Sequence, residues 1–306
     1  MKRCFLNERL KNIFLKNRDM RFIKMTGGLG NQMFIYAFYM RMKKHYRNTR
    51  IDLSDMVHYK AHNGYEMHRV FNLPPIEFRI NQPLKKVIEF LFFKKIYERK
   101  QVPSSLVPYD KKYFWPLLYF KGFYQSERFF ADMADDIRKA FTFNLRLSNR
   151  KTKEMSEQID HDENAVSIHV RRGDYLEPKY WKTTGCVCQL PYYLNAIAEM
   201  NKRISQPSYY VFSDDIAWVK ENLPLPKAFF IDWNKGAESW QDMMLMSRCR
   251  HHIICNSTFS WWGAWLNPRE NKTVIMPERW FRHCETPDIC PDKWIKVPIN
   301  QPDSIQ

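Results

Sequence analysis

Short apolar segments alternate with longer amphipathic segments through the second half of the chain, and this alternation strongly restricts its fold. Strands alternating with helices of about ten residues form βαβ units around a parallel sheet. The second half is therefore predicted to be an α/β domain, with its ligand site beyond the carboxyl ends of the strands. The predicted strands are 165–170, 209–212, 228–231, 252–255 and 273–276, and the predicted helices are 191–203, 214–222, 239–249 and 258–266.

The first half begins with the same kind of unit and then loses a clear pattern. A strand is predicted at 21–25, a helix at 31–46 and a second strand at 50–53. A further helix is expected at 126–141. Between these, residues 54–120 contain six prolines and no pattern that assigns an element.

Length sets the expected number of domains. The chain has 306 residues, which fits two domains at about 150 residues each. The polar stretch 146–163 is the expected linker. We therefore predict a basic extension over 1–19, one domain over 20–150 and a second over 151–306.

The chain is strongly basic, with 49 Lys and Arg residues against 33 Asp and Glu and a net charge of +16. Such a balance points to an anionic partner, which could be nucleic acid, anionic lipid or a phosphorylated substrate, and a Lys-rich solvated surface is the alternative. No apolar run reaches 18 residues and residues 1–20 lack the apolar core of a signal peptide, so we expect a cytoplasmic protein. Residues 1–19 are either a basic helix on an anionic membrane face or a frayed extension.

No metal site is predicted. The seven cysteines do not have zinc-ligand spacing, so reduced and buried thiols are expected. The acidic pair Asp160 and Asp162 precedes its strand, whereas a metal site for a nucleotide sugar should follow one.

A glycine cluster follows the first predicted strand. Three of the nine glycines, Gly27, Gly28 and Gly30, fall within four positions and precede Asn31 and Gln32. Backbone amides at the start of the next helix favour anion binding there, although a tight strand-to-helix turn would explain the glycines equally well. The residue at 33 is methionine, unlike the dinucleotide-binding fingerprint, and no Gly-Lys-Ser/Thr follows as in a P-loop.

The clearest candidate site lies at the end of the predicted strand 165–170. His169 and Arg171 project to the same side of the strand end, and Arg172 follows directly. Arginines there are unfavourable unless they meet anions, and the guanidinium fork matches phosphate oxygens. A structural ion pair is the alternative.

Two further strand ends bear polar residues. Asp214 follows the next strand, where a helix cap is one explanation. Asn256, Ser257 and Thr258 open the last predicted helix and form a second candidate anion site. The tryptophans that follow, Trp261 and Trp262, are expected to pack that helix rather than bind sugar.

These four blocks, in this order, closely resemble glycosyltransferase family 11, the α-1,2-fucosyltransferases. The resemblance implies a GT-B fold, in which two Rossmann-like domains face each other across a cleft. It implies inverting, metal-independent transfer of L-fucose from GDP-β-L-fucose to the 2-hydroxyl of a terminal β-galactoside, without a cofactor. A bacterial member would act on a surface glycan such as lipopolysaccharide O-antigen or capsule. Its acceptor could be lipid-linked and the enzyme peripheral on the inner membrane.

The resemblance also implies roles for individual residues. Arg171 would hold the β-phosphate, and His169 and Asp242 would contact guanine. Asp174 is a candidate base, with a dissociative route lacking a base as the alternative. The full predicted donor site comprises Gly28, Gly30, Asn31, Gln32, His169, Arg171, Arg172, Asp214, Asp242, Asn256, Ser257 and Thr258.

Three other functions remain open at this point. A nucleic-acid-binding protein would explain the charge, but the basic residues are spread along the chain and form no recognised module. A nicotinamide dehydrogenase would need the third glycine that Met33 replaces. A transferase with another linkage or acceptor, such as a protein O-fucosyltransferase, would differ only in its acceptor.

Overall fold

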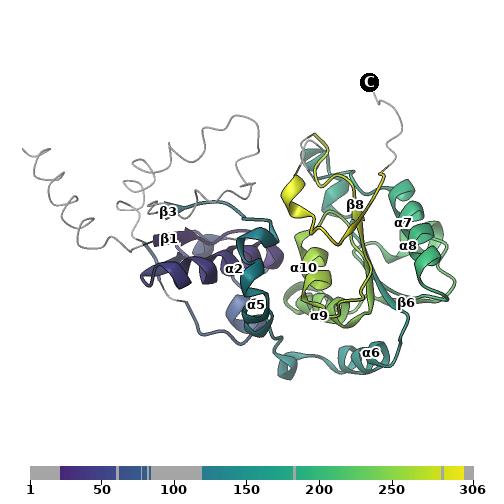
Figure 1. Ribbon diagram of the computed structural model, residues 1–306, viewed down its shortest axis with the longest axis horizontal. Helices are drawn as coiled ribbons and strands as arrows, with labels where there is room; N and C mark the ends of the chain where they lie inside the picture. The colour runs from purple at the N-terminus through teal and green to yellow at the C-terminus, as the bar shows by residue number, and fades with distance from the viewer. Residues whose placement is uncertain are drawn as a thin grey trace, which may run out of the picture.

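The chain forms two units with parallel sheets that face each other (Figure 1). The computed structural model describes residues 21–59, 62–76, 78–80, 83, 119–181, 184–283 and 286–299. The predicted extension over 1–19 lies outside these residues. Within the described ranges, no helix is long and apolar enough to cross a bilayer, and no group of three or more His, Cys, Asp or Glu residues could hold a metal ion.

The N-terminal unit is built on a three-stranded parallel sheet of order β2-β1-β3. A long helix, α2, follows the glycine turn and covers this sheet, because most of its residues are apolar and buried and its basic residues lie near its C-terminal end. The elements are β1 (Arg21–Lys24), α2 (Leu29–His45), β2 (Thr49–Asp52), η1 (Met56–His58), α3 (Met67–Val70), β3 (Tyr119–Phe120), η3 (Glu127–Phe129), η4 (Ala131–Met133), α5 (Ala134–Ala140) and η5 (Leu145–Leu147).

The continuous helix predicted at 126–141 is wrong in its first half. Two single 3-10 turns replace it, and only α5 is α-helical. The backbone leaves helical geometry at Phe130, with φ −147° and ψ 11°. This bend places the Phe130 ring against Trp262 of the other unit, 5.5 Å between ring centroids, so tertiary packing overrides the local pattern.

The C-terminal unit has a six-stranded sheet of order β6-β5-β4-β7-β8-β9, parallel throughout. This is the Rossmann order, and it reverses between β4 and β7, where ligands of such sheets bind. The strands are β4 (Ala165–Val170), β5 (Ser208–Ser213), β6 (Ala228–Ile231), β7 (His251–Ile253), β8 (Val274–Pro277) and β9 (Ile295–Val297). The helices are α6 (Arg150–Asp160), α7 (Leu190–Arg203), α8 (Ile216–Asn222), α9 (Trp240–Arg248) and α10 (Thr258–Leu266), with 3-10 turns η6 (Asp174–Leu176), η7 (Pro178–Tyr180), η8 (Gly236–Glu238) and η9 (Pro287–Ile289).

The stretch expected as a linker contains a helix, which corrects that prediction. Helix α6 begins at Asn149, whose side chain accepts a hydrogen bond from the Thr152 N–H, and it packs against α9. Only Thr152 and Ile159 of this helix are buried, so its sequence is mostly polar and resembles that of a linker. At its end, Asp160 forms an ion pair with Arg248 of α9.

The two units share one apolar core rather than meeting at a polar boundary. Helix α2 packs against α10, as the middle of Figure 1 shows. The Phe34 ring lies 4.5 Å from Trp261 and 4.8 Å from Trp262 between centroids, and the Trp262 Nε1–H donates to the Gly30 carbonyl oxygen at 2.9 Å. Both tryptophans are fully buried, so the prediction that they pack the helix is confirmed.

The architecture confirms the predicted α/β fold of the GT-B type, because two Rossmann-like units face each other. The exact boundary at 150/151 stays a prediction, although the chain enters α6 at that point.

Gly30 allows α2 to approach α10 closely, and its replacement tests this contact. A Cβ at Gly30 would lie 2.6 Å from the backbone carbon and Oγ1 of Thr258, which cannot move without shifting α10. We expect Gly30→Ala to lower the free energy of unfolding by about 1–3 kcal/mol, the usual cost of overpacking. Urea denaturation measures it, with Gly28→Ala as control, because that Cβ would meet only the His62 side chain. Equal stability of the two variants would contradict the close approach.

Candidate functional site

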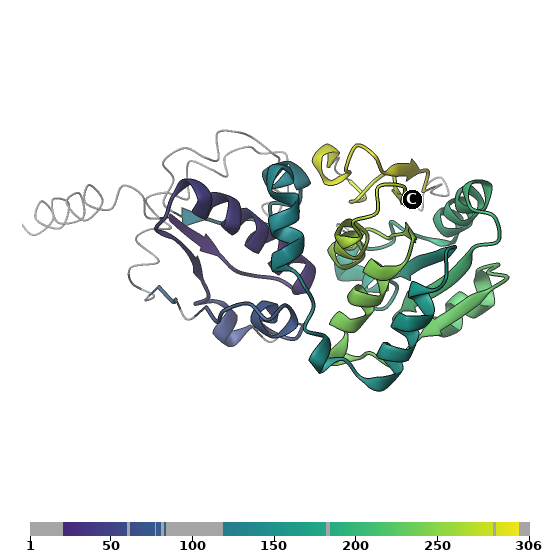
Figure 2. The same ribbon diagram turned by 60° about the horizontal axis from the view of Figure 1, so that its bottom comes forward.

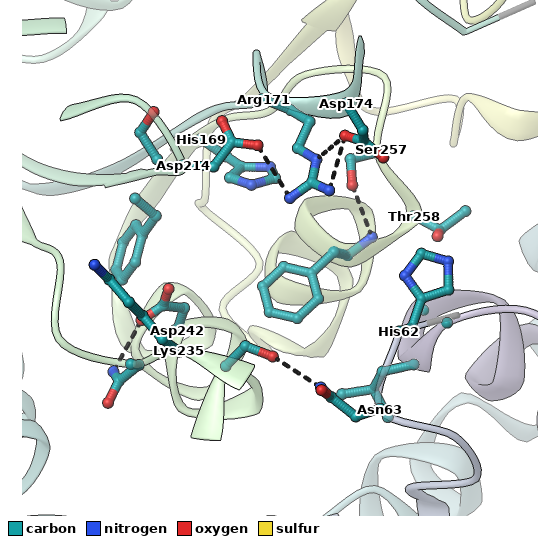
Figure 3. Close-up of a pocket in the computed structure, with 18 of the residues that line it drawn as sticks. His62, Asn63, His169, Arg171, Asp174, Asp214, Lys235, Asp242, Ser257 and Thr258 are labelled. Carbon is teal, nitrogen blue, oxygen red and sulfur yellow. Dashed lines mark hydrogen bonds and ion pairs between the residues drawn. The ribbon is translucent and has the colours of Figure 1, made fainter. Parts of the chain in front are cut away.

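A cavity of about 830 Å³ lies between the two units, at the carboxyl ends of β1, β4, β5, β6 and β7 (Figure 3). Its size falls in the range of about 300–1,000 Å³ that is usual for ligand sites. Figure 2, turned by 60°, shows the N-terminal unit on one side and the C-terminal unit on the other. The predicted site residues in its lining are Gly28, Gly30, Asn31, His169, Arg171, Asp174, Asp214, Asp242, Ser257 and Thr258.

Arg171 occupies the centre of the C-terminal wall. Its Nε donates to Asp174 Oδ1 at 2.9 Å, and its Nη1 lies 3.1 Å from Asp214 Oδ2. Burial opposes the positive charge, but the Asp214 and Asp174 carboxylates outweigh it and raise the pKa of Arg171 above its ordinary value. The guanidinium is therefore charged and oriented before any ligand arrives. Oxygens of an incoming phosphate could replace these carboxylates on the same fork.

His169 lies beside Arg171 as the alternation along β4 predicts. Its ring is buried, and Nδ1 lies 3.2 Å from the Cys255 thiol sulfur. Burial, together with the nearby Arg171 charge, lowers the pKa of His169 to about 4. The imidazole is therefore neutral at pH 7 and suited to hydrogen bonding rather than to charge neutralisation.

Asp242 forms a second polar centre, drawn opposite Arg171 in Figure 3. Its Oδ1 accepts from Asn234 Nδ2 at 2.9 Å, and Asn234 is itself held through its Oδ1 by Asn149 and Thr152. Burial raises the pKa of Asp242 to about 7, although the Asn234 hydrogen bond opposes the shift. A carboxylate in this position would favour the binding of a ligand that presents two neighbouring N–H donors.

Two helices direct their N-termini at the cavity. The first residues of α2, from Gly28 to Asn31, line it, and so do Ser257 and Thr258 at the start of α10. The Ser257 hydroxyl caps α10 by accepting from the Phe259 N–H. Unpaired amides and the helix dipole make both ends favourable for anions.

Three predicted donor-site residues do not line the cavity. Arg172 points away, with Nε 3.1 Å from Asp215 Oδ2 and its guanidinium 4.0 Å from the Trp218 ring centroid. Asn256 is buried, and its side-chain amide donates to two backbone carbonyl oxygens, those of Thr184 and Trp280. Both side chains already form contacts with neighbouring residues, so their surroundings do not favour direct contact with a sugar donor.

Gln32 is the third, and it joins two loops of the N-terminal wall. Its Nε2 donates to the Gly27 carbonyl at 2.9 Å and to the Gly64 carbonyl at 2.7 Å. Its Oε1 accepts from the Glu66 N–H at 3.0 Å. A fully buried amide with these partners positions the wall of the cavity rather than its contents.

The sequence did not single out several residues of the lining. Asn234 and Lys235 follow strand β6, and the expectation that ligands contact the residues after each strand could have found them. His62 and Asn63 come from the stretch 54–120, in which no pattern was recognised. Tyr180 lies in the loop after the arginine motif, where nothing in its spacing marks it.

The model of glycosyl transferase family 11 matches residues 11–297. An α-1,2-colitosyltransferase from Escherichia coli is 32% identical over 90% of this chain and 97% of its own. A galactoside α-(1,2)-fucosyltransferase 1 from Ateles belzebuth is 31% identical over 49% of this chain and 43% of its own.

A likeness to a solved structure is more distant. A NodZ α-1,6-fucosyltransferase co-crystallised with GDP is 14% identical, with a TM-score of 0.48, over 84% of this chain and 95% of its own.

The cavity that Arg171 shares with two helix N-termini is consistent with the family match, which covers nearly the whole chain. The resemblance inferred from the sequence is confirmed, and the protein is an enzyme that transfers a glycosyl group: it belongs to glycosyltransferase family 11.

Proposed function

We propose that the enzyme transfers L-fucose from GDP-β-L-fucose to the 2-hydroxyl of a terminal β-galactoside, with inversion and without a metal ion. The observation that supports this most is the placement of Arg171 at the switch point of the Rossmann sheet, in the same cavity as the N-termini of α2 and α10. That arrangement suits a pyrophosphate. The acceptor would be part of a bacterial surface glycan.

In this proposal the nucleoside lies toward Asp242, and the sugar lies toward the N-terminal wall. The N–H groups at positions 1 and 2 of guanine would donate to the Asp242 carboxylate, and His169 would also contact the base. Departure of GDP leaves negative charge on the β-phosphate and positive charge on the sugar ring. A preoriented guanidinium stabilises the first of these charges without reorganisation, a major source of rate acceleration in such sites.

A second donor follows from the relative that transfers colitose. Colitose lacks the 3-hydroxyl of L-fucose, so the two GDP-sugars differ at one polar group. A site built to hydrogen-bond that hydroxyl would reject the deoxy sugar strongly, by up to about 10⁴–10⁵-fold. A site without such a contact would accept both sugars at similar rates.

The test is transfer from each GDP-sugar to a panel of galactosides, with the product linkage assigned by NMR. We expect GDP-fucose to give an α-1,2 linkage, and EDTA to leave the rate within about twofold, since arginine and helix dipoles serve in place of a metal. Faster transfer from GDP-colitose would show that GDP-colitose, rather than GDP-fucose, is the preferred donor. Loss of activity in EDTA with recovery in Mn²⁺ would contradict the metal-free route.

The place of action is part of the same proposal. We propose a cytoplasmic enzyme that reaches a lipid-linked acceptor at the inner face of the bacterial membrane, helped by its net charge of +16. Sedimentation with vesicles containing anionic lipid, compared with neutral vesicles, tests that contact.

A further inference from the structure

In the proposed inverting reaction the acceptor hydroxyl loses a proton, and the geometry restricts where a group that takes this proton can lie. In an inverting displacement the acceptor oxygen and the leaving phosphate are on opposite sides of the anomeric carbon. Asp174 is the carboxylate that the sequence suggests. However, its Oδ1 accepts from Arg171 Nε at 2.9 Å and lies 2.8 Å from Nη2, so it sits on the leaving-group side.

His62 lines the cavity from a different part of the chain. It belongs to the N-terminal unit and lines the same cavity as Arg171, Asp174 and Thr258. Figure 3 shows its ring pointing into the space that these residues face, on the side away from Asp242. An acceptor sugar between this ring and the donor would have its hydroxyl within reach of a ring nitrogen.

The surrounding residues fix His62 in an unusual backbone conformation. Its φ is +56°, in the left-handed region that most residues avoid, and such conformations persist where neighbours impose them. Asn63 Nδ2 donates across the gap to the Gly236 carbonyl of the C-terminal unit at 2.8 Å. Gln32 holds the carbonyl of Gly64, two residues further on, at 2.7 Å.

Gly28 gives the ring its space. A Cβ on Gly28 would lie 3.2 Å from His62 Cγ, so the imidazole lies directly over the glycine turn at the start of α2. The ring therefore lies between the Gly28 backbone and the open cavity.

The charges around His62 favour a neutral ring with a free lone pair. Partial burial of the ring and the nearby Arg171 charge lower the pKa of His62 below its ordinary value, and the Asp174 carboxylate opposes this shift. Among the described residues, ionisable groups nearby include Tyr59, whose ring centroid lies 6.3 Å away, and Glu66, which is paired with Arg69. At pH 7 the ring is an acceptor of protons rather than a donor.

We propose that His62 is the general base of the transfer reaction, which rests on the proposed function. A ring nitrogen takes the proton of the acceptor hydroxyl while the oxygen forms its bond to the anomeric carbon. The bond from that carbon to the β-phosphate oxygen breaks, and its electron pair leaves with GDP beside Arg171. The imidazolium then returns its proton to water after the products depart.

The test compares His62→Gln with the matched control His68→Gln, an exposed histidine of the same segment that stacks on Tyr65 and does not line the cavity. We expect His62→Gln to lower kcat about 10²–10⁴-fold, the usual contribution of a general base. Calorimetric titration should show GDP affinity within threefold of the wild type. The fall of kcat at acid pH should vanish in this variant, while the control keeps both the rate and the profile.

Azide separates proton removal from other roles, because it attacks without a proton to lose. His62→Gln should form fucosyl azide at close to the wild-type rate while remaining slow with the galactoside. A loss of kcat below threefold, or an acid limb that persists in His62→Gln, would overturn the assignment. An equal loss with azide and galactoside would also overturn it. If the wild type neither binds GDP nor transfers fucose, the proposed function itself fails.

Discussion

Replacing Arg171 with alanine is expected to lower kcat about 10²–10³-fold, the cost of removing a preoriented donor from developing negative charge. The residue lies at the carboxyl end of β4 and its fork is held ready by Asp174 and Asp214. Arg171→Lys keeps a point charge but not the planar fork, so an intermediate loss is expected. Steady-state kinetics at saturating donor give kcat separately from donor binding.

Arg172 is the matched control for this experiment. It is adjacent in sequence, but its side chain pairs with Asp215 and stacks on Trp218 outside the cavity. Arg172→Ala should therefore leave kcat within a few-fold of the wild type. If both variants lose activity to the same extent, the loss reflects general disruption of the loop after β4. If Arg171→Ala retains near-normal kcat, this residue has no part in stabilising the leaving group.

GDP binding is expected to weaken about tenfold between pH 8 and pH 6 because of Asp242. Its pKa in the free enzyme is about 7, and guanine should bind the ionised form. Above this pKa the carboxylate is ready for the ligand. Below it a proton must first be released, and the affinity falls by about tenfold per pH unit. Isothermal titration calorimetry across this range measures the effect.

The corresponding variant is Asp242→Asn, for which we expect a loss of GDP affinity of about 10–100-fold, from one hydrogen bond to a charged group. Its pH dependence should disappear. Xanthosine diphosphate has a carbonyl oxygen in place of the 2-amino group of guanine, so it should bind this variant better than GDP does. Asp232→Asn is the control, since Asp232 is an exposed carboxylate of the same cavity. Unchanged GDP affinity in Asp242→Asn would show that the guanine ring binds away from this carboxylate.

Much of the fold could be predicted because its strands are short apolar runs in a buried parallel sheet. Every residue of β4 is buried, as its largely apolar sequence predicts, and this includes Ser167 and His169. Strand β9 is not apparent in the sequence because it has three residues, one of them Lys296, which give too little pattern. The sequence of helix α6 resembles that of a linker because the helix exposes most of its surface. Packing of Phe130 against Trp262, far apart in sequence, broke the helix expected before α5.

Some residues of the candidate site could likewise be predicted from the sequence, and others could not. Arg171 and His169 could be placed at the cavity because a strand end fixes where side chains project. Gln32 and Asn256 were assigned to the donor because their motifs approach it, yet both amides are occupied by backbone carbonyls of loops distant in sequence. His62 depends on a loop that only tertiary contacts through Gln32 and Asn63 define. No local sequence signal could have placed it in the same cavity as Arg171.

The buried contact of Phe34 with Trp261 and Trp262, and the hydrogen bond from Trp262 to Gly30, also limit how hybrid enzymes could be made. Recombining the acceptor-facing part of one family member with the nucleotide-facing part of another would separate partners that form a single core. Productive crossovers would have to exchange α2 and α10 together, or keep both from one parent. Specificity is therefore more easily altered at the cavity rim than by exchanging whole halves.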